Sequence, residues 1–202
     1  MNKVYKVFPG GKFKVLTFSY DDGKIEDRRL VKLFNKFNLK ATFNLNTGII
    51  DPAIRIPQEE WPELYKGHDI AVHTFTHPTM IRLNDYNALR EILDDKDNLE
   101  KIFKRPIYGL AYPNGSYDNR IVDIAKSVGI KYARVTNDKY AATKAAEAYA
   151  ANADGPMLIG DENGFSMPED YMCWVPTCHH NHNLIDFGKK FMALTKKQYL
   201  YM

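Results

Sequence analysis

The sequence predicts an α/β fold made of parallel β-α units. Short segments rich in β-branched and aromatic residues, such as 14–20, alternate with longer segments whose apolar residues recur at helical spacing, such as 84–103. Strands that alternate with helices indicate crossover connections and therefore a parallel sheet. There are enough of these units for a barrel, or for most of one.

The individual elements follow from the same patterns in chain order. Strands are expected at 14–20, 41–45, 69–73, 109–112, 132–135, 171–175 and 199–202. Helices are expected at 28–37, 58–65, 84–103, 119–128 and 184–194. Gly129 follows the fourth of these helices, where a left-handed residue often ends a helix. The stretch 141–168 interrupts the alternation, with an Ala-rich part expected to be helical and a turn-rich part expected to be a loop.

The composition is that of one ordinary globular domain. The chain has 202 residues, of which 45% are hydrophobic and 26% charged. This length suits a single core, so we treat residues 1–202 as one domain. Its last residues form an apolar, strand-like segment. Because a domain seldom ends inside a strand, we expect the natural protein to continue and this domain to lack its last strand or strands.

Several classes of partner are not expected. The net charge is +3 and the basic residues are scattered, so the sequence gives no sign of nucleic-acid binding. No apolar run approaches the ~20 residues that span a bilayer. No secretory signal is visible at the N-terminus, so a cytoplasmic location is the default expectation. Cys173 and Cys178 are expected to be reduced thiols rather than a disulfide. The oligomeric state is not determined by the sequence.

Metal-type ligands follow two of the expected strands. Asp21 and Asp22 follow the first strand, while His73 ends the third and His77 follows it. The carboxyl ends of parallel strands form the active face of a barrel, so these side chains should lie together. Pro78 disfavours a helical conformation for His77, which places it on a loop. Two neutral imidazoles and a carboxylate suit Zn, Fe, Ni or Co and leave positions open for water.

Each motif also has an ordinary interpretation. A histidine by itself is most often a packed or surface residue, and Asp-Asp-Gly is common in surface turns. The segment 111–118 is a turn that leads into a helix, and such a turn can also direct backbone N–H groups at a developing oxyanion. The three histidines within 179–182 are compatible with a second metal site, a polar edge that faces substrate, or a surface cluster. We interpret His68 as structural.

Taken together and in this order, the motifs resemble those of the polysaccharide deacetylase family, which is carbohydrate esterase family 4 with its chitooligosaccharide deacetylase homology domain. The resemblance runs from about Val15 to the end of the chain. The family's Thr-Phe-Asp-Asp-Gly corresponds to Ser-Tyr-Asp-Asp-Gly at 19–23, and its His-Ser/Thr-x-x-His corresponds to His-Thr-Phe-Thr-His at 73–77. The resemblance implies a distorted (β/α)7–8 barrel of the glycoside hydrolase/deacetylase type.

The first two motifs imply roles for individual residues. Asp22, His73 and His77 become the ligands of one divalent metal ion, with zinc preferred and Co, Ni, Fe or Mn as alternatives. Asp21 becomes the catalytic base. Thr74 becomes a brace for the loop between the two histidines.

The later motifs imply a contact for the oxyanion and a set of substrate-binding residues. The backbone N–H of Asn114 is the expected oxyanion contact. Tyr112, Pro113, His179 and His180 are assigned to substrate binding.

The third motif departs from the pattern of the family. The family carries an Arg that braces the base, followed by Pro-Tyr-Gly, whereas Ala111 stands at the Arg position here and Asn114 at the aromatic one. Asp21 therefore needs another orienting partner, for which the histidines at 179–182 are candidates. The general acid of the last motif, a histidine, would lie beyond Met202, so this chain is expected to be weakly active.

The implied activity is the removal of acetyl groups from N-acetylated or O-acetylated carbohydrate by a metal-activated water. One alternative is a hydrolase of small non-sugar amides or cyclic ureides on the same scaffold. The other is a non-catalytic carbohydrate-binding relic, which Ala111 at the Arg position and the missing last motif favour.

Overall fold

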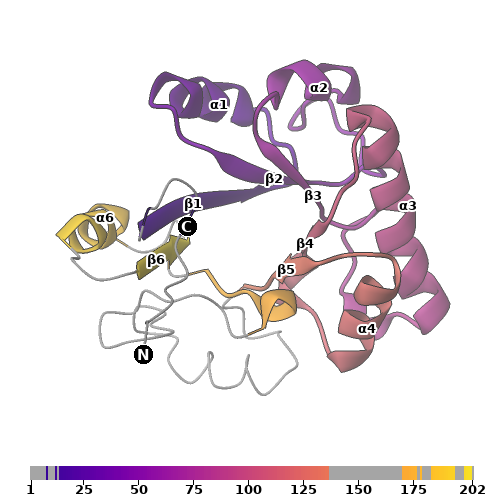
Figure 1. Ribbon diagram of the computed structural model, residues 1–202. Helices are drawn as coiled ribbons and strands as arrows, with labels where there is room; N and C mark the ends of the chain where they lie inside the picture. Colours follow the sequence, from indigo (N-terminus) through magenta and orange to yellow (C-terminus); the bar gives the residue numbers. More distant parts are fainter. Residues whose placement is uncertain are drawn as a thin grey trace, which may run out of the picture.

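The computed structural model describes residues 8, 12, 14–136, 170–176, 178, 183–193 and 198–201, and in them six parallel strands form one curved sheet (Figure 1). The strand order is β5-β4-β3-β2-β1-β6. The strands are β1 (Lys14–Asp21), β2 (Ala41–Leu45), β3 (Asp69–Val72), β4 (Gly109–Ala111), β5 (Tyr132–Arg134) and β6 (Gln198–Tyr201). Strands that follow one another from β1 to β5 are neighbours in the sheet, which confirms the succession of β-α units.

Helices connect these strands. They are α1 (Asp27–Lys36), α2 (Trp61–Leu64), α3 (Asp85–Phe103), α4 (Asn119–Ser127) and α6 (Leu184–Ala193), with short 3-10 turns η2 (Gln58–Glu60), η3 (Met80–Arg82), η4 (Pro113–Gly115) and η5 (Tyr171–Cys173). Side chains cap the starts of α3 and α4. The Asn84 oxygen accepts from Asn87 N–H at the start of α3, and the Asp118 oxygen accepts from Ile121 N–H at the start of α4.

One face of the sheet, which we call the helix-covered face, carries most of the hydrophobic core. Phe18 of β1 lies 4.8 Å from Phe34 of α1, and Phe43 of β2 lies 4.5 Å from Tyr65, measured between ring centroids. The buried strand residues on this face are Ala41, Phe43, Leu45, Ile70, Val72, Leu110 and Ala133. Figure 1 shows α1 to α4 ranged around this side of the curved sheet.

The opposite face of the same strands, which we call the site face, carries polar and small residues. Asp21 pairs with Asn44 across β1 and β2, and Ala111 pairs with Arg134 across β4 and β5. Gly109 of β4 leaves room for the Tyr132 ring, because a Cβ at Gly109 would lie 2.4 Å from that ring. Successive side chains of a strand point to opposite faces of the sheet, so apolar and polar residues that alternate in the sequence lie on different faces.

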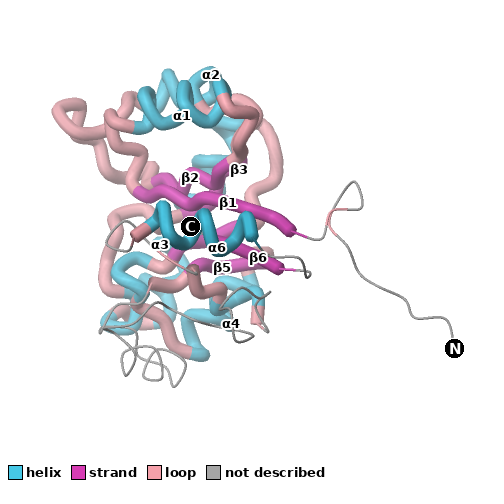
Figure 2. Tube along the Cα trace, turned by 90° about the vertical axis from the view of Figure 1, so that its left-hand side faces the viewer, coloured by secondary structure: helices cyan, strands magenta, loops and turns pink. Residues whose placement is uncertain are grey.

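The last described elements extend the sheet at both edges. Within 171–175, expected as a strand, residues 171–173 form η5 instead, and only Trp174 pairs with β5, through Arg134. The Asp170 carboxylate accepts from Met172 N–H, which favours a turn over an extended strand there. At the other edge, α6 packs Phe187 and Phe191 against Leu16 of β1 and lies in front of β1 and β6 in Figure 2.

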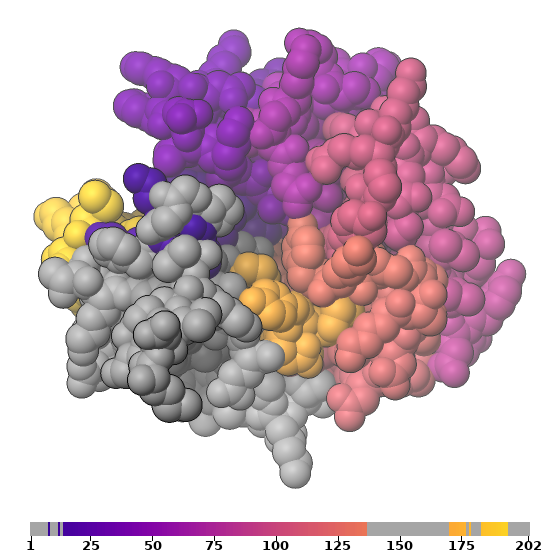
Figure 3. Space-filling model, in the orientation of Figure 1, coloured from indigo at the N-terminus to yellow at the C-terminus, as the bar shows by residue number. Residues whose placement is uncertain are grey.

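The remaining predictions concern the cysteines, the stretch 141–168, three of the histidines and membrane-spanning helices. Cys173 and Cys178 are both free thiols. The stretch 141–168 and the histidines at 179, 180 and 182 lie outside the described residues. Among the residues that the structure describes, no helix has the length and apolar character needed to cross a membrane. In the space-filling view the segments from β1 to α4 form one continuous packed body (Figure 3).

Candidate metal centre and catalytic residues

Three potential metal ligands come together at the carboxyl ends of β1 and β3. Asp22 follows β1 directly, His73 follows β3, and His77 lies on the loop before η3. One carboxylate oxygen and one ring nitrogen from each histidine lie within 4.8 Å of one another. The donor set of two imidazoles and one carboxylate is one that binds zinc and related divalent ions, so the residues present fit such an ion.

His73 is held in the tautomer that a metal ligand needs. Its Nδ1 lies 2.8 Å from the carbonyl oxygen of Ala111, which can only accept, so Nδ1 carries the proton and Nε2 keeps its lone pair. Nε2 lies 3.8 Å from Asp21 Oδ2 and 4.0 Å from Asp22 Oδ1. Burial lowers the pKa of His73 despite the charge of Asp21, so the ring is neutral.

Left-handed backbone conformations gather at this site. Asp22 (φ 77°), Thr74 (66°), His77 (57°) and Asn114 (56°) all have positive φ without being glycine. Such conformations cost on the order of 1–3 kcal/mol each and persist only where surrounding contacts hold them, least costly for Asn and Asp. The surroundings of the site must therefore supply that restraint.

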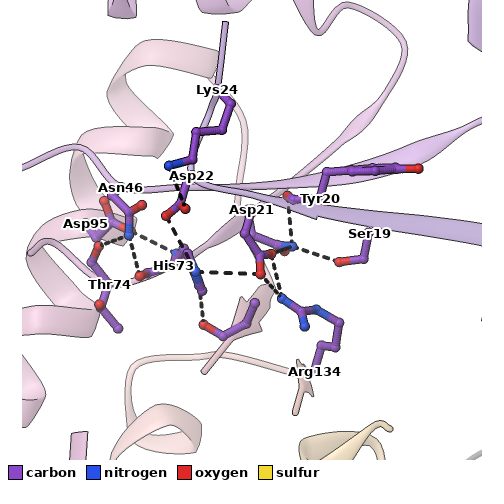
Figure 4. A network of polar contacts seen from close by, with 12 residues as sticks. Ser19, Tyr20, Asp21, Asp22, Lys24, Asn46, His73, Thr74, Asp95 and Arg134 are labelled. Atoms are coloured by element: carbon purple, nitrogen blue, oxygen red, sulfur yellow. Dashed lines mark hydrogen bonds and ion pairs between the residues drawn. The ribbon is translucent and has the colours of Figure 1, made fainter. Parts of the chain in front are cut away.

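Asp21 is held by a residue that sequence analysis did not identify. Nη2 of Arg134 lies 2.5 Å from both carboxylate oxygens, and the Asn44 amide donates to Oδ1 at 2.8 Å (Figure 4). Burial raises the pKa of Asp21, but the Arg134 guanidinium and then His73 outweigh it and hold the pKa well below the ordinary value. The Asp21 side chain is therefore ionised.

The expected histidine partner for Asp21 lies outside the described residues, and the contacts that the structure gives come from Arg134 and Asn44 instead. Ala111 and Arg134 are cross-strand neighbours, so the guanidinium enters from the strand beside the one where the family pattern places it. The signal in the sequence was a charged residue at the carboxyl end of an otherwise apolar strand, 132–135. Without knowledge of which strands are neighbours in the sheet, the sequence does not connect Arg134 with Asp21.

Asp22 also has cationic neighbours that sequence analysis missed. Arg55 Nη1 donates to the Asp22 carbonyl oxygen at 2.5 Å, and Arg55 Nη2 lies 3.3 Å from the Asp22 carboxylate. Lys24 Nζ also lies 3.3 Å from that carboxylate (Figure 4). Burial raises the pKa of Asp22, but His73, Arg55 and Lys24 outweigh it and lower that pKa. Arg55 thus stabilises both the ionised carboxylate and the left-handed backbone of Asp22.

The loop after β3 is held by Asn46 rather than by the Thr74 hydroxyl. The Asn46 amide donates to the carbonyl oxygens of His73, at 2.5 Å, and Thr74, at 2.8 Å. Thr74 Oγ1 is buried and has no hydrogen-bond partner among the described residues. The expected bracing role of Thr74 is therefore not met by its hydroxyl, because the backbone of this loop is bound by a neighbouring side chain.

The turn after β4 carries the other predicted residues. Asn114 lies in η4 with its left-handed backbone, three residues after Ala111. Tyr112 and Pro113 are buried, and the Tyr112 ring stacks on Tyr117 with centroids 5.1 Å apart. These two side chains support the turn from the core, so their burial does not favour the predicted substrate contact. His179 and His180, the other predicted substrate residues, lie outside the described residues.

Fold and site together are those of a parallel β/α protein with a candidate divalent-metal centre at its strand ends. A profile of the polysaccharide deacetylase family matches residues 9–133, and the chain belongs to that family. The deacetylases of this family hydrolyse acetylated carbohydrate and generally use a divalent metal. The sheet described here corresponds to part of their (β/α) barrel, as the sequence predicts.

Solved structures of deacetylases have the same fold. The Streptococcus pyogenes deacetylase PplD, in complex with acetate, is 27% identical over 64% of this chain and 58% of its own, with a TM-score of 0.60. BC0361, a polysaccharide deacetylase from Bacillus cereus, is 19% identical over 86% of this chain and 50% of its own, with a TM-score of 0.63. BA3943 from Bacillus anthracis, a family pseudoenzyme, is 17% identical over 98% and 66%, with a TM-score of 0.55.

This chain thus spans 50–66% of the length of these proteins. Two of the three are less than 25% identical to it and establish the fold alone. A search of proteins with curated functions finds no match.

Proposed function

We propose that residues 1–202 carry the catalytic domain of a metal-dependent deacetylase that removes acetyl groups from N-acetylated or O-acetylated carbohydrate. One observation carries the proposal. The ligand atoms of Asp22, His73 and His77 lie within 4.8 Å of one another, beside a second carboxylate, Asp21, that Arg134 holds in place. A metal site with an adjacent ionised carboxylate is the minimum that this hydrolysis needs.

Asp22, His73 and His77 would hold the cation, with zinc preferred. Bound there, a divalent cation would polarise the acetyl carbonyl and lower the pKa of a nearby water. The neutral ring of His73 and the ionised carboxylate of Asp22 meet the protonation states that binding requires. Family membership supports this proposal, since the family generally uses a divalent metal.

Asp21 acts as the base in this proposal. As the water oxygen bonds to the acetyl carbon, Asp21 takes the water proton, and the bond from that carbon to the sugar nitrogen or oxygen then breaks. Acetate leaves, and the freed amine or hydroxyl takes a proton. Arg134 and Asn44 hold Asp21 in one orientation, so it does not need to be ordered during the reaction. The backbone N–H of Asn114 would donate to the developing oxyanion.

The relic interpretation loses one of its supports. It was favoured by Ala111 at the position of the bracing Arg, but Arg134 makes an equivalent contact to Asp21 from the neighbouring strand. The alternative of a small amide or cyclic ureide substrate keeps the same metal ligands and would differ only in the residues that surround the substrate.

The ligand set is tested by metal binding. Metal-free protein is titrated with Zn²⁺ and with Co²⁺ by calorimetry, and His77→Ala is expected to bind at least ~100-fold more weakly, beyond the 10–100-fold that loss of an outer partner costs. His68→Ala is the matched control, because His68 is a buried histidine that contacts Ala41 N–H rather than the site. Tight binding by His77→Ala would show the ligand set to be wrong.

The substrate class is tested by product release. Acetate is measured with N-acetylglucosamine oligomers and acetylated xylan, and ring opening is measured with small cyclic amides. Acetate release from sugars that depends on added metal supports the proposal. Turnover of the cyclic amides alone would favour the alternative hydrolase, and oligomer binding without any release would favour the relic.

A further inference from the structure

The loop that bears both histidines lies along α3, and its C-terminal part is bound to Glu91. The Thr76 N–H and hydroxyl donate to the two Glu91 carboxylate oxygens, at 2.7 and 2.6 Å. The Phe75 N–H donates to the Glu91 carbonyl oxygen at 2.9 Å. Glu91 thus fixes the two residues that immediately precede His77.

The N-terminal part of the same loop is bound to Asp95. Asp95 is fully buried, and its Oδ2 accepts from the His73 N–H at 3.1 Å (Figure 4). Its Oδ1 accepts from the N–H and the hydroxyl of Thr47, at 2.6 and 2.8 Å, which ties this end of the loop to the segment after β2.

Glu91 and Asp95 are four residues apart, so they lie on the same face of α3 about one helical turn apart. Asp95 binds the start of the loop, and Glu91 binds its end. Along this loop Thr74 and His77 have left-handed conformations, which are uncommon for non-glycine residues and costly for the β-branched Thr74. The distance between the two histidines therefore depends on contacts from outside the loop, which include Asn46 and these two acceptors on α3, because the loop's own residues do not specify its shape.

We infer that Glu91 and Asp95 are a pair of positioning residues that hold His73 and His77 at the separation needed to bind one divalent cation. The inference rests on the proposed metal site and adds the device that preorganises it. Without the pair the loop relaxes, and cation binding has to restore its conformation at the expense of affinity. Outer contacts to metal ligands commonly change affinity by about 10–100-fold.

The decisive variants are Glu91→Ala and Glu91→Gln. Alanine removes both acceptors from Thr76 and keeps the helix. Glutamine has lost the charge, but its amide oxygen can accept from Thr76 N–H and its amide nitrogen can donate to the Thr76 hydroxyl. Asp97→Ala is the matched control, since Asp97 is an exposed acid on the same helix. Asp95→Asn is a second variant, in which an amide N–H would face the N–H of either His73 or Thr47.

Zn²⁺ and Co²⁺ affinities are measured by calorimetry, together with the visible spectrum of bound Co²⁺ and the urea unfolding of the metal-free protein. We expect Glu91→Ala to weaken binding by about 10–100-fold and to change the Co²⁺ spectrum. Glu91→Gln should stay within about threefold of the original protein, and Asp97→Ala should be unchanged. Glu91 is partly exposed, so its variants stay informative if Asp95→Asn fails to fold.

Two results would overturn the inference and leave the proposed function intact. One is a Glu91→Ala protein with the affinity and Co²⁺ spectrum of the original. The other is a Glu91→Gln protein as weak as Glu91→Ala, which would assign the effect to charge instead of geometry. A failure of the unmodified protein to bind either ion would instead overturn the proposed metal site, and the positioning role with it.

Discussion

The two faces of the sheet use the same strands for different purposes. The helix-covered face consists of large apolar residues such as Phe43 and Leu110, whose packing needs only complementary volume. The site face carries Asp21, Asn44 and Arg134, which depend on particular hydrogen-bonding partners. A substitution on the first face should therefore change stability, whereas one on the second should change chemistry.

The largest expected effect is on the site face, at Asp21. Asp21→Asn keeps the size and one acceptor of the side chain but cannot take up a proton, so the rate of acetate release should fall by ~10²–10⁴-fold. Affinity for Zn²⁺ should change little, because Asp21 is not in the ligand set. Steady-state kinetics and calorimetry check both expectations. Full activity in Asp21→Asn would show that another group is the base.

The next largest effect is on the helix-covered face, at Phe43. Its ring is fully buried against Tyr65 and His68, so Phe43→Ala should cost about 3–5 kcal/mol of unfolding free energy. Urea unfolding of the metal-free protein measures this. Thr42→Ala, one residue away on the other face, should cost less than about 1 kcal/mol. Similar losses at both positions would contradict the division between the faces.

Arg134 tests whether the site face needs geometry as well as charge. Lysine keeps the positive charge but has only one nitrogen on a flexible stem, so Arg134→Lys should leave Asp21 less well oriented. We expect acetate release to fall about 10–100-fold, with metal affinity and unfolding nearly unchanged. Arg120→Lys, at the Asp85 ion pair on the surface of α4, is the control. Equal rates for Arg134→Lys and the original would remove Arg134 from the positioning residues.

The smallest effect concerns Asp27, a buried carboxyl beside the helix-covered face. Burial raises its pKa to about 6, although Tyr65 OH donates to it at 2.8 Å. The folded state therefore holds this proton up to a higher pH than the unfolded state, so stability falls as pH rises through the window from about 4 to about 6. Its share of the loss between pH 5 and pH 7 should be about 1 kcal/mol.

Asp27→Asn has no proton to lose, so that part of the pH dependence should disappear. Urea unfolding at the two pH values measures the difference. Asp123→Asn, an exposed acid on α4, should leave the dependence as it is in the original protein. If Asp27→Asn keeps the full pH dependence, a different group titrates in this window.

Much of the fold was predictable because its signals are local. Short segments rich in β-branched and aromatic residues located β1 to β5, and apolar residues at helical spacing located α3 and α4. The expected strand at 171–175 was wrong because the Asp170 carboxylate accepts a hydrogen bond from Met172 N–H, which favours a turn, and composition alone does not reveal that bond. Local patterns thus gave the elements and missed one whose conformation depends on a single contact.

The sequence by itself determined which groups can bind a metal, because Asp-Asp and His-x-x-x-His follow strands whose ends must meet in a parallel sheet. Tertiary structure decided what holds those groups. Arg134 reaches Asp21 from 113 residues away through strand register, and Asp95 reaches His73 through the packing of α3. An arginine or an acid on a helix has the same chemistry at many positions. Only the folded geometry brings one of them within hydrogen-bonding distance of the site.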